Sequence, residues 1–309
     1  MRVVVALGGN ALLERGEPAD SDIQQSHVTR AAAALAPLLR DHQLILTHGN
    51  GPQVGMLALE SAGDPALAHP YPFDVLGAQT QGMIGYWLVQ ALETASPGQR
   101  AACLICRTLV KADDPAFSQP AKFVGPVYEE GEARRLAGAR GWHIRPDGPS
   151  WRRVVPSPEP AALVELEMIE TLASQGVTVV CAGGGGIPVV AGPSGLRGVE
   201  AVVDKDLTAA LLASAVRAGA LLMLTDVEAV MERYGTPAAR PIRRITAAQL
   251  RSRIQSGEFP AGSMGPKAEA ACRFAATTGG MAAIGRLADA AALLAGRAGT
   301  IVVKRRGQG

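Results

Sequence analysis

Short runs of apolar and β-branched residues recur along the chain and alternate with alanine-rich segments of helical spacing. The apolar runs predict buried strands, and they lie at 3–7, 43–48, 102–110, 177–184, 220–227, 281–285 and 300–303. The alanine-rich segments predict helices, at 26–41, 159–176, 206–219 and 266–279. This alternation predicts an α/β fold, a three-layer α/β/α sandwich with an open, mainly parallel sheet.

The stretch 111–160 interrupts this alternation. It is rich in proline, carries two of the three tryptophans and has no clean period. We interpret it as an insertion that protrudes from the sheet edge as a separate subdomain, either a decorative loop or a functional lid. A second distinctive segment, 72–95, is apolar and aromatic, and it predicts a helix that either lies inside one subunit or forms a surface for dimerisation.

Composition narrows the class of protein. With 309 residues, 48% apolar and 19% charged, the chain is an ordinary globular protein. Thirty basic residues against 28 acidic ones are too balanced for a nucleic-acid surface, so we expect small partners. No apolar run approaches the ~20 residues of a membrane span, and the first strand is too short for a signal peptide. We therefore expect a cytoplasmic protein.

Cysteine usage agrees with a reducing compartment, because most of the four cysteines lie in apolar surroundings. Cys103 and Cys106 form a C-x-x-C pair, which is compatible with half a zinc site or a redox pair. No second pair or nearby histidine completes such a site. The favoured interpretation is a buried strand.

Three glycine-rich turns follow predicted strands, in "LGGNAL", "THGNGPQVG" and "CAGGGGIPV". The carboxyl ends of parallel strands meet at one edge of a sheet, so the turns predict a shared anion site. Neither nucleotide fingerprint is present: Asn10 and Ala11 stand where a P-loop has lysine and serine or threonine. A dinucleotide-binding glycine motif is also missing, which argues against a Rossmann dehydrogenase.

Positive charge for such a site must come from elsewhere. Three lysines lie among residues typical of turns rather than on a solvated helix face. They are Lys122, Lys205 and Lys267. Each of them alone is more typical of a surface residue. Lys205 is the exception, because it lies between Asp204 and Asp206 at a predicted helix start, where the carboxylates can cap the helix, bind magnesium indirectly or orient the ammonium group.

Seven motifs carry a resemblance to a known family. They occur in the order "VVVALGGNALL", "THGNGPQVG", "RRVVPSP", "AGGGGIPV", "GVEAVVDKDLTAALLA", "LLMLTDVEAVMERYGTP" and "GSMGPKAEAA". Together they resemble the carbamate kinases of the amino acid kinase superfamily nearly end to end. The "RRVVPSP" and "DKD" motifs distinguish carbamate kinases from their relatives.

The resemblance implies where the missing charge lies. Many superfamily members carry a lysine at the position held here by Ala6, whereas carbamate kinases use Lys122 and Lys205. Lys267 matches the lysine that contacts the transferring phosphate from the nucleotide side. Asp206 matches the aspartate that holds the lysines in place. These four are the expected catalytic residues.

The implied reaction is reversible phosphoryl transfer between ATP and carbamate, which gives ADP and carbamoyl phosphate. Carbamate is small and anionic, so a nest of backbone amides is a suitable receptor. The residues expected to bind it are Gly8, Gly9, Asn10, Gly49, Asn50 and Gly51. Mg²⁺ is the expected cofactor, and since phosphates and water hold most of its coordination sphere, no protein metal ligand is assigned.

The resemblance also divides the chain. One domain, 1–309, has an N-terminal lobe at 1–215 for carbamate and the phosphoryl group, with a lid at 111–155, and a nucleotide lobe at 216–309. Residues expected along the nucleotide are Asp226, Val227, Tyr234, Gly235 and Lys267. The alternative for Tyr234 is an ordinary half-buried tyrosine.

Two other functions stay open. One is a kinase of another small acid on the same fold, and the other is a nucleotide-sensing regulator that has lost catalysis. A regulator of that kind is expected to lose a lysine, and Lys122, Lys205 and Lys267 are all present. The family also implies a homodimer, and a role in arginine catabolism in the direction of ATP synthesis.

Overall fold

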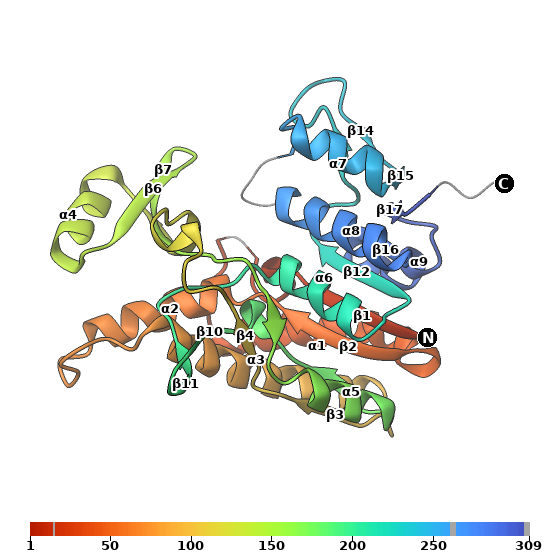
Figure 1. Ribbon diagram of the computed structural model, residues 1–309, viewed down its shortest axis with the longest axis horizontal. Coiled ribbons are helices and arrows are strands. Elements are labelled where there is room, and N and C mark those ends of the chain that lie inside the picture. Colours follow the sequence, from red (N-terminus) through yellow and green to blue (C-terminus); the bar gives the residue numbers. More distant parts are fainter. Residues whose placement is uncertain (15, 260–263, 306–309) are drawn as a thin grey trace.

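An eight-stranded sheet runs through the centre of the computed structural model, which describes residues 1–14, 16–259 and 264–305 (Figure 1). The side chain of Asn10 is also outside the described part. From edge to edge the strands are β15 (Arg244–Thr246), β17 (Thr300–Val303), β16 (Met281–Arg286), β12 (Ala220–Thr225), β1 (Arg2–Leu7), β2 (Gln43–His48), β9 (Thr178–Val180) and β3 (Ala101–Cys103). Only β16 and β17 pair antiparallel in this sheet as described, which confirms the mainly parallel prediction.

Helices cover both faces of the sheet, because alternate residues of each central strand point to opposite sides. Val4 and Ala6 of β1 pack in one core with helices α5 (Leu166–Ser174), α6 (Lys205–Ala215), α7 (Ala247–Gln255) and α8 (Met264–Thr278). Val3, Val5 and Leu7 pack in the other core with α1 (Ser21–Asp41), α3 (Phe73–Ala95) and α9 (Ala290–Leu294). The predicted three-layer α/β/α sandwich is confirmed.

The apolar run at 102–110 is not one strand, and that prediction is wrong. It divides into β3 of the central sheet and β4 (Arg107–Leu109), which joins β10 (Ile187–Gly192), β11 (Gly195–Gly198) and β8 (Ala162–Leu163) in a second sheet. The side-chain amide of Gln81 on α3 accepts from Cys106 N–H at 2.8 Å and donates to its carbonyl at 3.0 Å. These bonds satisfy the backbone where the chain leaves the first sheet.

The insertion is more regular than its sequence indicates. It contains a three-stranded antiparallel sheet of β5 (Lys122–Tyr128), β7 (Ser150–Val155) and β6 (His143–Asp147), with α4 (Glu130–Arg140) packed on it. We call residues 111–160 the subdomain; its β6, β7 and α4 project at the upper left of Figure 1. A register shift between Val124 and Val127 breaks the period of β5, which concealed the strand in the sequence.

The remaining elements join these layers. The predicted helix at 159–176 is shorter, because β8 occupies part of it and α5 begins only at Leu166. Helix α2 (Gly51–Gly63) follows β2, and β13 (Met231–Glu232) pairs with β14 (Arg240–Pro241). Short 3-10 turns lie at Gly9–Ala11, Pro115–Phe117, Gly183–Gly185 and Leu287–Asp289. None of the helices described is both long and apolar enough to cross a membrane.

Candidate functional site

The first two glycine turns touch each other at the carboxyl ends of β1 and β2. The Gly8 N–H donates to the Leu224 carbonyl at 2.8 Å, and a Cβ on Gly8 would lie 2.9 Å from that oxygen. The Gly49 N–H donates to the Leu7 carbonyl at 3.0 Å, and a Cβ there would lie 3.0 Å from Gly9 N. Both N–H groups are therefore occupied within the chain, so these two glycines supply close packing rather than donors for a ligand.

Helix α2 begins beside these turns, with Asn50 as its N-cap and Gly51 as its first residue. The first N–H groups of a helix have no partner within it, and the helix dipole favours an anion there. The Asn50 side chain is held by a hydrogen bond from its Nδ2 to the Thr80 hydroxyl at 2.8 Å. The predicted substrate residues therefore fall into two groups. Gly8 and Gly49 pack closely against neighbouring backbone, whereas Asn50 and Gly51 begin a helix.

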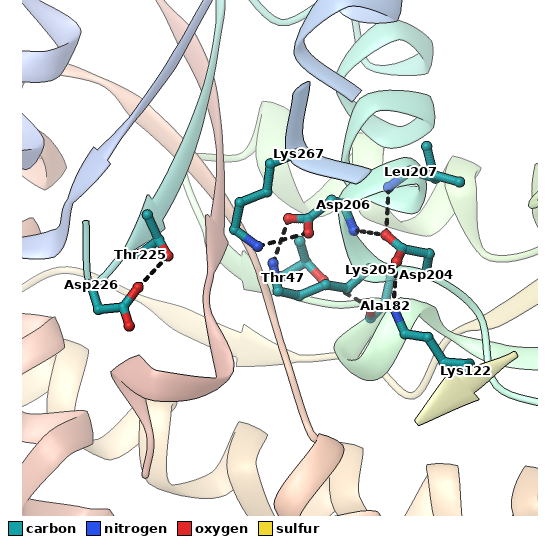
Figure 2. A network of polar contacts seen from close by, with 10 residues as sticks. All are labelled: Thr47, Lys122, Ala182, Asp204, Lys205, Asp206, Leu207, Thr225, Asp226 and Lys267. Atoms are coloured by element: carbon teal, nitrogen blue, oxygen red, sulfur yellow. Dashed lines mark hydrogen bonds and ion pairs between the residues drawn. The ribbon is translucent and has the colours of Figure 1, made fainter. Parts of the chain in front are cut away.

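The third glycine turn packs against the second. A Cβ on Gly184 would lie 2.2 Å from the amide nitrogen of Asn50, so only glycine fits. Thr47 on β2 donates to the Ala182 carbonyl at 2.8 Å (Figure 2), and Thr108 donates to the Gly185 carbonyl at 2.8 Å. Ala182 is held at φ 51° in this turn. The three turns therefore lie together at this end of the sheet, and the shared anion site stays a prediction.

The three lysines come from distant parts of the chain and meet beside these turns (Figure 2). Lys205 and Lys267 both donate to the carboxylate of Asp206, at 2.5 and 3.0 Å. Lys122, the first residue of β5, donates to Asp204 at 2.5 Å. The Cε of Lys205 lies 3.5 Å from the position that a Cβ on Gly49 would take, so Lys205 borders the second glycine turn.

Asp204 has two functions, one for each carboxylate oxygen. Its Oδ1 caps α6 by accepting the N–H groups of Asp206 at 2.9 Å and Leu207 at 3.3 Å. Its Oδ2 accepts Lys122. The predicted helix cap is therefore confirmed, and the same residue also holds a lysine of the subdomain. Asp204 was not among the site residues predicted from the sequence, although the "DKD" motif contains it.

The pKa values of Asp206 and Lys205 depend both on burial and on the charged groups beside them. Burial by itself would raise the pKa of Asp206, but the ammonium groups of Lys205 and Lys267 outweigh it and hold that pKa well below its usual range. Burial lowers the pKa of Lys205, and Asp206 opposes this effect. Three ammonium groups against two carboxylates leave a net positive site at the N-terminus of α6.

His48 is a neighbour that the sequence analysis missed. It ends β2, is 1% exposed, and its Nδ1 lies 3.0 Å from the Gly49 carbonyl. Burial lowers the pKa of His48 to about 4, the Gly49 carbonyl opposes this, and the Lys205 ammonium adds to the lowering. The ring is therefore neutral near pH 7 and adds no charge to the lysine cluster. Its place in "THGNGPQVG" was the signal.

The residues expected along a nucleotide lie apart from the lysine cluster. Asp226 and Val227 follow β12, and the Thr225 hydroxyl donates to Asp226 at 3.0 Å (Figure 2). Tyr234 and Gly235 lie between β13 and β14. Tyr234 is 68% exposed, so the alternative of a half-buried tyrosine is wrong. Lys267, in the first turn of α8, belongs to the cluster itself.

The C-x-x-C pair lies where the chain passes from β3 to β4. Cys103 ends β3, Cys106 is fully buried, and no disulfide joins them. Within the described ranges, no group of three His, Cys, Asp or Glu side chains is arranged to hold a metal ion. Part of the motif "GSMGPKAEAA" also lies outside these ranges, because Gly262 and Ser263 belong to the segment 260–263.

Comparisons with known proteins show which family this chain is similar to over nearly its whole length. The model of the amino acid kinase family matches residues 1–284. A carbamate kinase of Rhizobium meliloti (strain 1021) is 49% identical over 307 residues, covering 98% of this chain and 93% of the relative. Carbamate kinase from Giardia lamblia bound to citric acid has a TM-score of 0.93 and 38% identity, with 98% of each chain covered. The same enzyme bound to AMP-PNP has a TM-score of 0.90, 38% identity and the same coverage.

The charge cluster predicts a dependence of stability on acid. The folded-state pKa of Asp206 lies below its unfolded value, so the carboxylate stabilises the fold above about pH 4 and this contribution is lost as the pH falls further. Asp206→Asn removes that proton uptake. Its free energy of unfolding should therefore fall less steeply between pH 5 and pH 3 than that of the wild type, by at most about 1.4 kcal/mol per pH unit.

Urea unfolding at each pH measures this difference. Asp113→Asn is the control, since Asp113 is an exposed carboxylate of the subdomain, and its profile should follow the wild type. Parallel profiles for Asp206→Asn and the wild type would contradict the charge argument.

Proposed function

The chain belongs to the amino acid kinase family, and on this premise we propose that it is a carbamate kinase, which transfers a phosphoryl group reversibly between MgATP and carbamate. The observation that carries the proposal is the cluster of Lys122, Lys205 and Lys267, held by Asp204 and Asp206 beside the glycine turns. Full-length similarity to carbamate kinases supports the same substrate.

In the proposed mechanism the chain positions two anions and neutralises the charge between them. Carbamate lies at the start of α2, where the N–H groups of Asn50 and Gly51 receive its oxygens. One carbamate oxygen attacks the terminal phosphorus of the nucleotide as the bond to the ADP oxygen breaks. The ammonium groups of Lys122, Lys205 and Lys267 lie around the equatorial oxygens, where negative charge is spread in the transition state.

Each carboxylate has a positioning role in this scheme. Asp206 keeps Lys205 and Lys267 together, and Asp204 keeps Lys122 beside α6. Neither carboxylate is free to hold a metal ion by itself, because each already pairs with lysine. Magnesium therefore enters as part of the nucleotide substrate, held mainly by phosphate oxygens and water.

We assign the nucleotide to the lobe 216–309 and the phosphoryl acceptor to the lobe 1–215. Exposed Tyr234 and Val227 offer apolar surface for the adenosine, with Asp226 and Gly235 beside them. Residues 111–155 act as a lid that carries Lys122. The lid also excludes water, which otherwise competes with carbamate for the phosphoryl group.

The other two candidate functions receive less support. A regulator without catalysis has no reason to retain three lysines gathered around two buried carboxylates, since a buried charge that loses its partner is costly. A kinase of a larger amino acid needs a group that recognises its amino substituent, and the three glycine motifs contain no acidic residue for it. For the setting we propose a cytoplasmic enzyme of arginine catabolism that runs toward ATP synthesis.

The proposed activity predicts ATP formation from carbamoyl phosphate. The purified chain, given carbamoyl phosphate and MgADP, should produce ATP in a luciferase-coupled assay. Acetyl phosphate, which lacks the nitrogen, is the comparison substrate and should react more slowly. Absence of ATP from carbamoyl phosphate would count against this function and favour a kinase of another small acid.

The lysine cluster predicts a large effect of one substitution. Lys205→Ala should lower turnover by about 10²-fold or more, the scale of losing one preorganised donor, with little change in thermal stability. Lys205→Arg should rescue poorly, because a guanidinium fork does not fit between Gly49 and Asp206 as a point charge does.

Steady-state kinetics and thermal unfolding measure both effects. Lys111→Ala is the matched control, since Lys111 is an exposed lysine of the subdomain, and it should retain normal turnover. Near-normal turnover of a folded Lys205→Ala variant would mean that the "DKD" segment is only a helix cap.

Helix α3 predicts a homodimer. It buries Ile84, Leu88 and Leu92 in its own subunit yet exposes Val75 (37%) and Tyr86 (58%) on another face. Light scattering at micromolar concentration should give twice the mass of the chain. Tyr86→Glu should weaken the dimer, whereas Tyr71→Glu, which changes another exposed tyrosine, should not. A monomeric wild type would refute this proposal.

A further inference from the structure

Arg153 on β7 has an unusual environment for an arginine. Its guanidinium lies between two aromatic rings, 4.7 Å from the Phe73 ring centroid and 4.8 Å from that of Trp142. Phe73 is the first residue of α3 in the main body, whereas Trp142 lies in the subdomain. The Arg153 side chain is 19% exposed. It therefore joins the two parts of the chain through one stacked cation.

Glu200 completes this contact from the main body. One of its carboxylate oxygens lies 3.8 Å from the Arg153 guanidinium. The other accepts the Phe73 N–H at 2.8 Å, at the N-terminus of α3. Arg153 is thus held by an aromatic face and a carboxylate whose own position is set by the backbone of α3. This is a defined docking site for the side chain rather than a chance surface contact.

The backbone next to Arg153 also fits closely against the main body. A Cβ on Gly55 of α2 would lie 2.1 Å from the Cα of Gly125 on β5, so the two chains pass with no room for a side chain. Gly125 has φ +71°, and its carbonyl accepts Arg152 Nε at 2.6 Å. The apolar side chains of Val124 and Val155 pack beside this contact in one cluster with Val54, Ala58, Phe73 and Leu76.

The docking site is linked directly to Lys122. In the ladder of β5 and β7, Arg153 lies opposite Val124 and Val155 lies opposite Lys122, so the lysine is two residues from the docked position. The segment that leads into α6 holds both ends, since Glu200 pairs with Arg153 and Asp204 pairs with Lys122. If this strand pair moves away from α3, Lys122 must move with it.

We propose that Arg153 is a positioning residue for phosphoryl transfer, which fixes the subdomain against α2 and α3 so that Lys122 faces the reacting group. This inference rests on the proposed function. Arg153 itself touches neither substrate, and it acts through the shared ladder of β5 and β7. Its planar guanidinium suits this role because it can stack on two rings and pair with Glu200 simultaneously, which an ammonium group cannot do equally well.

Kinetics of paired variants test the link to Lys122. Arg153→Gln should lower kcat/KM for carbamoyl phosphate about tenfold, mainly through kcat, because fewer molecules have Lys122 in place. In a Lys122→Ala background the same change should have less than about a twofold effect. Arg153→Lys should be intermediate. An equal loss in both backgrounds would overturn the proposal, since Arg153 would then act through overall stability.

Arg140→Gln is the matched control. Arg140 also stacks on the Trp142 ring, at 5.1 Å, but it is exposed at the end of α4, a helix that packs mainly on β6 and β7 of the subdomain. Its loss should leave kcat and KM unchanged. A loss comparable to that of Arg153→Gln would show that Trp142 packing alone matters, and the docking proposal would fail.

Hydrogen exchange separates this inference from the proposed function, because it does not depend on activity. Exchange of the backbone amides of β5 and α2, followed by mass spectrometry, should be faster in Arg153→Gln and unchanged in Arg140→Gln. Unchanged exchange in folded Arg153→Gln would overturn the proposal, even if activity fell. If Arg153→Gln fails to fold, Phe73→Leu removes the ring from the other side and should give the same faster exchange.

Discussion

The carboxylate of Asp206, buried between two lysines, is the interaction on which the site depends. Two ammonium groups about 4 Å apart repel by roughly 4 kcal/mol at an effective dielectric constant near 20. Asp206 offsets this repulsion by accepting both Lys205 and Lys267. It can do so only because α6 and α8 pack closely, and alanines such as Ala209 and Ala271 in their shared core allow that approach. The fold thus concentrates positive charge that would otherwise disperse.

Asp204 likewise holds a lysine, in this case one from the subdomain. A helix N-terminus needs an acceptor for its first N–H groups, and Asp204 supplies one with a single oxygen. The second oxygen is then left to hold Lys122, so a local requirement of α6 fixes a lysine from a distant segment. Glu200 repeats this arrangement at α3, where it accepts the Phe73 N–H and faces Arg153. The carboxylates at the starts of α6 and α3 therefore each also hold one cation of the subdomain, Lys122 and Arg153 respectively.

The parts of the fold that could be predicted are those whose burial is complete. Apart from Arg2 and Thr225 at their ends, strands β1 and β12 are apolar, because both of their faces lie in a core. The division of 102–110 was not predictable, since it depends on the Gln81 amide from another element. The strands β6 and β7 of the subdomain carry arginine, proline and tryptophan instead of an alternating apolar pattern. Side-chain stacking and contacts with the main body stabilise them, and the local sequence pattern does not encode these contacts. The three lysines and Asp206 could be named from the resemblance, but the pairing of Lys122 with Asp204 depends on tertiary packing.

Lysine and arginine occupy different kinds of position in this chain. Of the 30 basic residues only five are lysine, and three of these five form the cluster around Asp204 and Asp206. The chain uses arginine for nearly every other positive charge, as at Arg153, where a flat group stacks on rings. A transferring phosphoryl group requires compact charges that approach from several directions, and an ammonium group provides them where a broad fork would clash with Gly49. Under the proposed function, three of the five lysines therefore serve the chemistry, whereas Lys111 and Lys304 are exposed residues outside the cluster.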